Sequence, residues 1–224
     1  LIFAICSAIT SLDVSNFDTS LVSDMNRMFQ GMNSLKKLNL DNFNTANVTD
    51  MSAMFQNFKS LTSLSIANFD TSKVEDFYAM FDYCTDLTSI DLSKFDTAEV
   101  TDMSMMFTYC AVSSLEFSTF DTRKVENMES MFFGCNKIKE LDLSSFRTEK
   151  VRNMQEMFFL CSSLVKLDIS NFDTSSVTSM AYMFSNCLVI TSLDLSHFNT
   201  KKVTTMDSMF RYLSVVEKID ISSF

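Results

Sequence analysis

Cysteine is the residue type in this chain with the broadest reactivity, and its spacing decides which chemistry is open to it. Successive cysteines lie 25, 26 or 78 residues apart, so none forms the short Cys-x-x-Cys pair of a zinc knuckle. Three interpretations stay open: buried free thiols that act as apolar fillers, disulfides between neighbouring repeats, and a metal site. Other repeats carry Met32, Phe58 or Leu213 at this position, which favours free, buried thiols. The cysteines are Cys6, Cys84, Cys110, Cys135, Cys161 and Cys187.

The single histidine, His197, is the other candidate for catalysis. It shares its repeating position with asparagine, lysine, serine and threonine residues, which predicts an exposed loop. A catalytic histidine needs a nucleophile and an orienting acid nearby, and the sequence holds no Gly-x-Ser-x-Gly or His-Glu-x-x-His phrase. The sequence therefore predicts a protein that is not an enzyme and that needs no cofactor.

An acidic column is the most informative exposed feature. One residue of each predicted strand lies between two inward-facing apolar residues, so the period-two alternation points it outward. Stacked like charges repel, which leaves two interpretations: a solvated face that resists sheet aggregation, or a contact surface for a basic partner or for weak Ca²⁺ binding. Lys37, Lys166 and Lys218 flank the column and partly neutralise it, which favours the first. The column comprises Asp13, Asn39, Ser65, Asp91, Glu116, Asp142, Asp168, Asp194 and Asp220.

A second candidate surface is aromatic and lies in the middle repeats. Phe133 and Phe159 directly follow a Met-Phe pair, and Tyr83, Tyr109 and Leu160 lie one position further on. On a loop they would form an apolar strip along one edge, and such patches mark interfaces; packing under the loop is the alternative. The candidate partner-binding residues are Asp91, Glu116, Asp142, Asp168, Asp194, Asp220, Tyr83, Tyr109, Phe133 and Phe159.

An internal repeat must position all of these residues. A Ser-x-Phe-Asp-Thr-like phrase and a Met-Phe pair recur in register, with a spacing of 26 residues and one step of 25 between Phe95 and Phe120. Because both phenylalanine columns lie within the apolar periodicity, we expect them in the core and not in a stacking platform for bases or sugars. The first phenylalanines are Phe17, Phe43, Phe69, Phe95, Phe120, Phe146, Phe172, Phe198 and Phe224.

Each repeat contains the signals of a strand, a turn and a return. Alternation around Leu12 and Val14 predicts a short strand, and residues 18–20 favour a turn or helix N-cap. Apolar residues at 22, 25, 28, 29 and 32 fit one stripe of a helix of two or three turns; a 3₁₀ turn is the alternative. The fold expected is an α/β leucine-rich-repeat solenoid with one short parallel strand and a helical return per ~26-residue turn.

Composition limits the classes of function. The chain has 224 residues, 46% of them hydrophobic, and a formal net charge of −10. The negative charge argues against nucleic-acid partners, and no apolar stretch reaches the ~20 residues of a membrane span. Two glycines and no proline predict few left-handed backbone residues. We expect residues 1–224 to be a single uncapped solenoid of about eight and a half repeats and part of a longer chain.

The repeat resembles a known family. The phrase CSSLVKLDISNFDTSSVTSMAYMF at residues 161–184 is similar to the BspA-type, or Treponema-type, leucine-rich repeat, in the branch found in bacterial and mycoplasma surface lipoproteins. The resemblance covers the whole chain. It departs at the Met-Phe-x-Gly-Cys position, where only Gly31 and Gly134 match. It implies an extracellular or cell-surface protein involved in adhesion or in binding other proteins.

Two non-catalytic functions follow from repeat and resemblance together. The first is a cell-surface or extracellular module for protein–protein binding or adhesion. The alternative is a structural subunit of a filament or surface coat that self-associates through repeat ends or edges. Both predict a protein partner or self-association, no nucleic acid and no membrane insertion by this segment.

Overall fold

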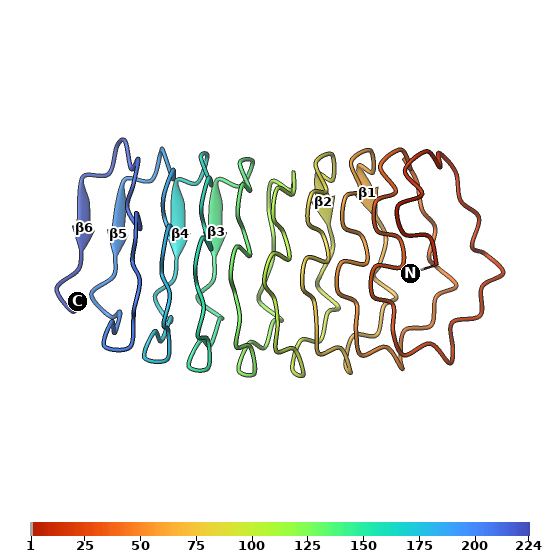
Figure 1. Cartoon of the computed structure of the whole chain (residues 1–224), viewed down its shortest axis with the longest axis horizontal. Coiled ribbons are helices and arrows are strands. Elements are labelled where there is room, and N and C mark those ends of the chain that lie inside the picture. The colour runs from red at the N-terminus through yellow and green to blue at the C-terminus, as the bar shows by residue number, and fades with distance from the viewer. Residues whose placement is uncertain (1) are drawn as a thin grey trace.

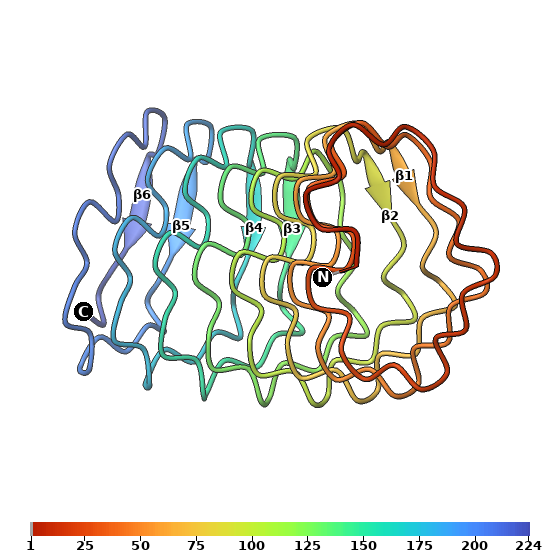
Figure 2. The ribbon, with the colours of Figure 1, turned by 45° about the vertical axis from the view of Figure 1, so that its right-hand side comes forward.

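The computed structural model describes residues 2–224 as a row of stacked coils, each formed by one repeat (Figure 1). Neighbouring coils are joined by backbone hydrogen bonds between equivalent positions, as from the Phe29 N–H to the Met54 carbonyl oxygen at 3.1 Å. Successive coils trace similar outlines (Figure 2). The repeat architecture expected from the sequence is therefore present.

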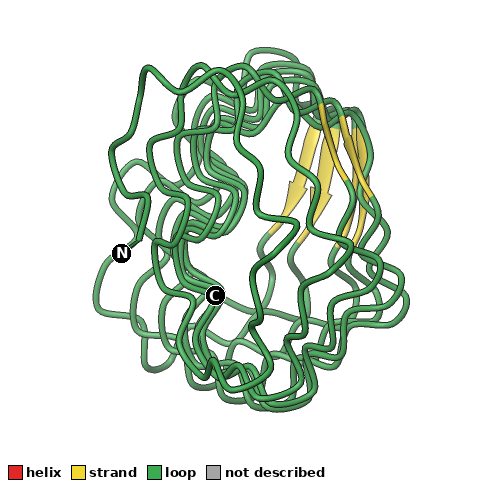
Figure 3. Ribbon diagram, turned by 90° about the vertical axis from the view of Figure 1, so that its right-hand side faces the viewer, coloured by secondary structure: helices red, strands yellow, loops and turns green. Residues whose placement is uncertain are grey.

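Short parallel strands lie along one side of the stack. Viewed down the axis, they occupy one side of the outline, and loops and turns form the rest (Figure 3). They pair as β1-β2, β3-β4 and β5-β6, in a register such as Leu141 opposite Leu167 and Asp142 opposite Asp168. We call this side the strand ladder. The strands are β1 (Ser63–Leu64), β2 (Ser89–Ile90), β3 (Glu140–Asp142), β4 (Lys166–Asp168), β5 (Ser192–Asp194) and β6 (Lys218–Asp220).

The predicted helical return is wrong. Residues 2–224 contain no helix, and the segment predicted to be helical directs its backbone into the next coil. The N–H groups of Met25, Arg27 and Phe29 donate to carbonyl oxygens of the neighbouring coil at 2.9, 2.9 and 3.1 Å. An α-helix would instead direct them to the residue four positions earlier. We call this segment, residues 24–31 and their equivalents, the Met-Phe ladder.

Left-handed residues explain why a helix-like pattern does not produce a helix. Arg27 and Gly31 have φ angles of 52° and 78°, and later coils repeat positive φ at both positions. Two left-handed residues per coil turn the chain so that Met25, Met28 and Phe29 all reach the core. Fifteen non-glycine residues within 2–224 have positive φ, so the expectation of few left-handed residues is also wrong. A left-handed conformation costs about 1–2 kcal/mol per residue, which the hydrogen bonds between coils offset.

The core is one apolar cluster that runs along the stack. The phenylalanines of the Met-Phe pairs form a continuous ring stack; Phe29 and Phe55, for example, lie 6.0 Å apart and 7° from parallel. Val112 is fully buried in the 25-residue repeat and fills the core there. The prediction that both phenylalanine columns belong to the core is confirmed for most of their members; Phe17 and Phe210 are only partly buried, and Phe224 is exposed.

The threonine column links coils through side chains. The Thr122 hydroxyl accepts a hydrogen bond from the Arg147 N–H at 2.7 Å and donates to the carbonyl oxygen of the same residue at 2.8 Å. One buried hydroxyl thus satisfies two backbone groups of the next coil, a role that the turn or N-cap interpretation did not include. The same pair of hydrogen bonds is made by Thr19, Thr45, Thr71, Thr97, Thr148 and Thr174.

The cysteine column lies mostly in the core as free thiols. Five of the six cysteines are buried, and Cys6 is partly exposed. The thiols of Cys135 and Cys161 lie 3.0 and 3.1 Å from the carbonyl oxygens of Phe107 and Phe132 in the preceding coil. The cysteines thus fill apolar space and also supply a donor to a buried carbonyl group. Burial raises the pKa of Cys110 to about 12, which makes this thiol a poor nucleophile at neutral pH.

Candidate functional site

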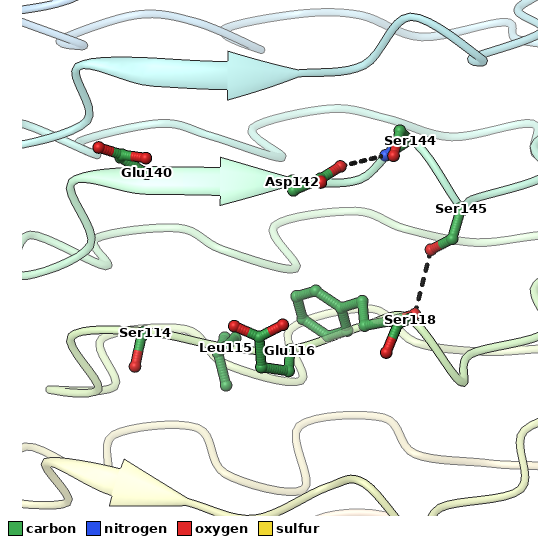
Figure 4. A pocket seen from close by; sticks show the side chains of 9 residues that line it. Ser114, Leu115, Glu116, Ser118, Glu140, Asp142, Ser144 and Ser145 are labelled. Atoms are coloured by element: carbon green, nitrogen blue, oxygen red, sulfur yellow. Dashed lines mark hydrogen bonds between the residues drawn. The ribbon is translucent and has the colours of Figure 1, made fainter.

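The acidic column lies on the strand ladder, where most of its carboxylates close a local turn. The Asp142 carboxylate accepts a hydrogen bond from the Ser144 N–H at 2.9 Å, as Figure 4 shows. Asn39 makes the same bond to the Asp41 N–H at 2.8 Å, so the turn needs an acceptor and not a charge. The equivalent bond is made by Asp13, Asp91, Asp168, Asp194 and Asp220.

These turns also stabilise the charged form of several column residues. Hydrogen bonds from the Ser144 hydroxyl and N–H lower the pKa of Asp142, and the equivalent serines lower the pKa of Asp91 and Asp194. Lys166 lies opposite Glu140 in the register and adds a nearby positive charge. The column thus has a structural role as a row of turn acceptors. A role in binding a basic partner stays a prediction.

A groove lies in the strand ladder at the 25-residue repeat. Residues 114–118 form no strand, and β3 pairs only with β4 on its other side. A groove of about 420 Å³ lies between this coil and β3, and a groove of equal volume lies at the paired strands β1 and β2. Glu116, Glu140 and Asp142 line it together with four serines, and the Ser145 hydroxyl crosses it to the Phe117 carbonyl oxygen at 3.0 Å (Figure 4).

The four predicted aromatic residues lie together as a continuous strip beside the Met-Phe ladder. Tyr83 and Tyr109 have ring centroids 4.8 Å apart, Tyr109 and Phe133 are 5.0 Å apart, and Phe133 and Phe159 are 4.9 Å apart. Tyr182 extends the strip, 5.8 Å from Phe159. All five side chains are partly exposed, and Tyr83 is 40% exposed. We call these five residues the aromatic strip.

The backbone explains how the strip is built. Tyr83 and Tyr109 occupy a left-handed position of the coil, with φ angles of 56° and 50°. In the next coil the same position is Gly134, whose missing side chain leaves room for the Tyr109 ring; a Cβ there would lie 2.6 Å from that ring. In that coil and the next, the aromatic residues of the strip lie one position earlier, at Phe133 and Phe159.

Carboxylates with neutral hydrogen-bond partners lie beside the strip. Glu156 accepts a hydrogen bond from the Ser130 hydroxyl at 3.1 Å, and Glu129 accepts one from the Asn153 side-chain amide at 2.8 Å. Burial and then the charge of Glu156 raise the pKa of Glu129. Burial, Tyr83 and then the charge of Glu156 raise the pKa of Tyr109. Glu156 occupies the left-handed position that Tyr182 has in the next coil, and its carbonyl oxygen accepts a hydrogen bond from the Phe159 N–H at 3.0 Å, so Glu156 lies beside the strip.

Asp82, one residue before Tyr83, is a buried carboxyl. Its Oδ2 atom accepts a hydrogen bond from the Gln56 side-chain amide at 2.6 Å, whereas its Oδ1 atom is buried without a partner. Burial raises the pKa of Asp82 to about 6. Gln30 also bonds Gln56, so this carboxyl ends a short row of stacked polar side chains.

The acidic column and the aromatic strip therefore lie on different ladders. Glu129, Glu156 and Tyr182 were missed, because in the expected helix their positions faced no aromatic neighbour. His197 is exposed, and its Nε2 atom lies 3.0 Å from the Ile169 carbonyl oxygen.

Across the described residues no group of three or more histidine, cysteine, aspartate or glutamate side chains could hold a metal ion, and weak Ca²⁺ binding stays a prediction. No helix of residues 2–224 is long and apolar enough to cross a membrane.

Comparison with solved structures identifies several similar repeat proteins. A leucine-rich repeat protein from Eubacterium ventriosum is 16% identical over 86% of this chain and 40% of its own, with a TM-score of 0.43. The internalin InlF from Listeria monocytogenes is 14% identical over 85% of this chain and 43% of its own, with a TM-score of 0.33. The functional domain of Listeria monocytogenes InlJ, which includes a cysteine ladder, is 11% identical over 97% of this chain and 47% of its own, with a TM-score of 0.35. The chain thus spans less than half the length of these three proteins.

Comparison with protein families identifies the family of this chain. None of the curated proteins matches the chain. A family model described as "Mycoplasma protein of unknown function, DUF285" matches residues 1–114, 80–166 and 128–224, which together span the whole chain. The chain therefore belongs to the DUF285 family, and the resemblance of its repeats to the BspA-type leucine-rich repeat of the mycoplasma branch is confirmed.

Proposed function

We propose that this chain is a non-catalytic protein-binding module, displayed at a cell surface, that binds its partner through the aromatic strip. The observation that carries the proposal is the contiguity of five partly exposed rings, with centroid separations of 4.8 to 5.8 Å. Contiguous exposed apolar surface on a soluble protein marks an interaction site more often than isolated exposed residues do. Tyrosine and phenylalanine are also enriched at protein interfaces.

The rest of the chain shows that exposure of these rings is not required by the fold. The phenylalanines of the Met-Phe pairs stack within 14° of parallel, and Phe55, Phe81 and Phe107 are fully buried. At the positions of Phe133 and Phe159 other repeats carry Gln30 and Ser185, so the coil accepts polar residues there. The aromatic side chains of the strip therefore need a reason other than coil formation, and partner binding supplies one.

The acidic column is the second proposed surface, and it ranks below the strip. Most of its residues have a structural reason, because their carboxylates close turns on the strand ladder. Adhesion and cell-surface display form part of the proposal and rest on the family resemblance. Proteolytic shaving of intact source cells would test display: loss of the protein without lysis supports it, and full protection contradicts it.

Peptide selection tests the binding surface even while the partner is unidentified. Displayed random peptides are selected on the wild-type chain and then tested on two double variants, Phe133→Ser with Phe159→Ser and Asp142→Lys with Asp168→Lys. We expect the selected peptides to lose binding to the first variant and to keep binding to the second. Equal binding to both would remove the strip as the binding surface. Thermal unfolding of each variant serves as the folding control.

Light scattering over a concentration series, with and without Ca²⁺, tests the alternative function. A monomer at all concentrations supports a display module. Open-ended growth supports a self-associating filament or coat subunit and contradicts the proposal in its present form.

A further inference from the structure

The aromatic strip differs from the core ring stack in the way its rings meet. Core neighbours such as Phe107 and Phe132 lie 5° from parallel, so each ring covers the face of the next. In the strip, Tyr109 and Phe133 are inclined at 68°, and Phe133 and Phe159 at 80°. Edge-to-face neighbours cannot cover one another's faces completely. The face of an aromatic ring carries partial negative charge and attracts cations.

The charges beside the strip have one sign. Glu129 and Glu156 are held by an amide and a hydroxyl, which leave their charges unneutralised. None of the three ion pairs that residues 2–224 form includes Glu129 or Glu156; the pairs are Arg123 with Asp121, Lys124 with Glu99, and Arg152 with Glu126. Asp82 adds a third carboxyl next to Tyr83.

Within the coils that carry the strip, no basic residue shares these positions. Between the coils of Tyr83 and Tyr182, the positions equivalent to residues 26, 27, 30 and 31 hold no lysine or arginine. Arg27 occupies one of these positions in an earlier coil, and Arg211, which lies over the Tyr212 ring at 4.6 Å, does so in a later coil. Aromatic faces and carboxylates therefore occur together without an internal cation.

We propose that the aromatic strip, with Glu129 and Glu156, binds the lysine or arginine side chains of an extended basic segment in the partner protein. Ring faces and carboxylates attract the same cation, and the strip follows the stacking direction over several coils, which suits an extended segment better than a single ion. The inference rests on the proposed function, because it names the chemistry of the partner that the strip binds.

Calorimetric titration with two synthetic peptides tests the inference. The probes are an eight-residue peptide of alternating arginine and serine, and the same peptide with glutamine in place of arginine. We expect the arginine peptide to bind at low ionic strength, to weaken as salt is added, and to bind at least about tenfold more tightly than the glutamine peptide.

Two charge-matched variants locate the interaction. Glu129→Gln with Glu156→Gln removes two charges beside the strip, and Asp142→Asn with Asp168→Asn removes two on the strand ladder. We expect the first to weaken binding of the arginine peptide about tenfold or more, and the second to change it less than about twofold. Equal weakening would mean general attraction to a negative chain and would overturn the inference.

The outcomes also separate this inference from the proposed function. If Phe133→Ser with Phe159→Ser abolishes binding of displayed peptides that carry no basic residues, and Glu129→Gln with Glu156→Gln has no effect, the strip binds an apolar partner. The inference then fails and the proposed function stands. If neither double variant alters any binding, both fail.

Discussion

The strand ladder and the Met-Phe ladder show two ways of joining the same coils. On the strand ladder the pairing is interrupted: β1-β2, β3-β4 and β5-β6 are separate pairs, each strand two or three residues long. On the Met-Phe ladder, parallel bridges join coil after coil from Asp24 to Thr205. The Met-Phe ladder, whose sequence predicts a helix, therefore supplies the most continuous backbone pairing. The strand ladder, whose sequence predicts a sheet, is paired only in part.

The carboxyl groups of the two ladders differ in their exposure and in the direction of their pKa shifts. Strand-ladder carboxylates such as Asp142 are exposed and accept local hydrogen bonds, which lower their pKa. Burial raises the pKa of Asp76, Asp82 and Glu129 on or beside the Met-Phe ladder. The strand ladder therefore uses its acids as turn acceptors, whereas burial of these three acids of the Met-Phe ladder imposes an energetic cost on the charged form. Acids kept despite such a cost are the stronger candidates for binding.

The largest expected effect compares two core truncations of equal size in one coil. Met131→Ala on the Met-Phe ladder should cost about 4 kcal/mol, and Leu141→Ala on β3 about 2 kcal/mol. Both side chains are buried, but hydrogen bonds to both neighbours hold the backbone around Met131, whereas β3 borders the open groove and can shift to fill the space. Equilibrium unfolding in urea measures both. A higher cost for Leu141→Ala would reverse our ranking of the ladders.

A buried carboxyl gives the second prediction. Asp82 has a folded-state pKa of about 6, above the ordinary value of 3.8. Its favourable contribution to stability is therefore fully present below about 3.8 and is lost as pH rises through 6. Asp82→Asn removes this loss, so we expect the variant to be more stable than wild type at pH 7.5, by at most about 3 kcal/mol, and equal to it near pH 4.

Thermal unfolding at the two pH values measures the difference. The control is Asp142→Asn on the strand ladder. The pKa of Asp142 is lowered, so its contribution is present above the ordinary value and is lost as pH falls through the lowered one. Stabilisation of both variants at pH 7.5 would mean that net charge, and not burial, is responsible.

Side-chain bonds between coils give the third prediction. Thr122→Val keeps the shape but removes the hydroxyl that serves both the N–H and the carbonyl group of Arg147, so we expect a loss of about 1–3 kcal/mol. Thr122→Ser keeps the hydroxyl and should lose less. The matched strand-ladder change is Thr88→Val, whose exposed hydroxyl bonds only the Thr62 carbonyl oxygen at 3.3 Å; its effect should stay within about 0.5 kcal/mol. Chemical denaturation of all three variants would show whether buried hydroxyls carry this linkage.

Period and residue type made the repeat, the core columns and the strand position predictable. Leu141 is buried between the exposed Glu140 and Asp142, as alternation required. The return was not predictable in the same way, because spacings of three and four residues are shared by helices and by coils with two left-handed residues. Arg27, Ala53 and Ala79 give no local sign of positive φ. At the other position, Gly31, Asn57 and Gly134 are a partial sign, since glycine and asparagine tolerate this conformation best.

The candidate site was likewise predictable only in part. Tyr83, Tyr109, Phe133 and Phe159 could be grouped from the sequence because the repeat places them at adjacent positions of successive coils. Tyr182 and Glu156 could not be added, because they lie at the left-handed position of Arg27, three or four residues before the positions of the other rings, and the helical interpretation placed that position on a regular surface. Their approach to the strip depends on how each coil turns, and that information is in the backbone bonds between coils.

The smallest expected effect tests the left-handed position itself. Leu160 has a φ angle of 60° and is partly exposed. Glycine adopts this conformation without a Cβ penalty, so Leu160→Gly should be more stable than Leu160→Ala by about 1 kcal/mol. On the strand ladder the order should be reversed: at the exposed Ser192 of β5, glycine should be less stable than alanine by about 0.5–1 kcal/mol. Urea unfolding of the four variants gives both differences. If alanine were the more stable residue at both positions, the left-handed turn would not be a fixed feature of the coil, and the physical distinction between the two ladders would have to rest on hydrogen bonding alone.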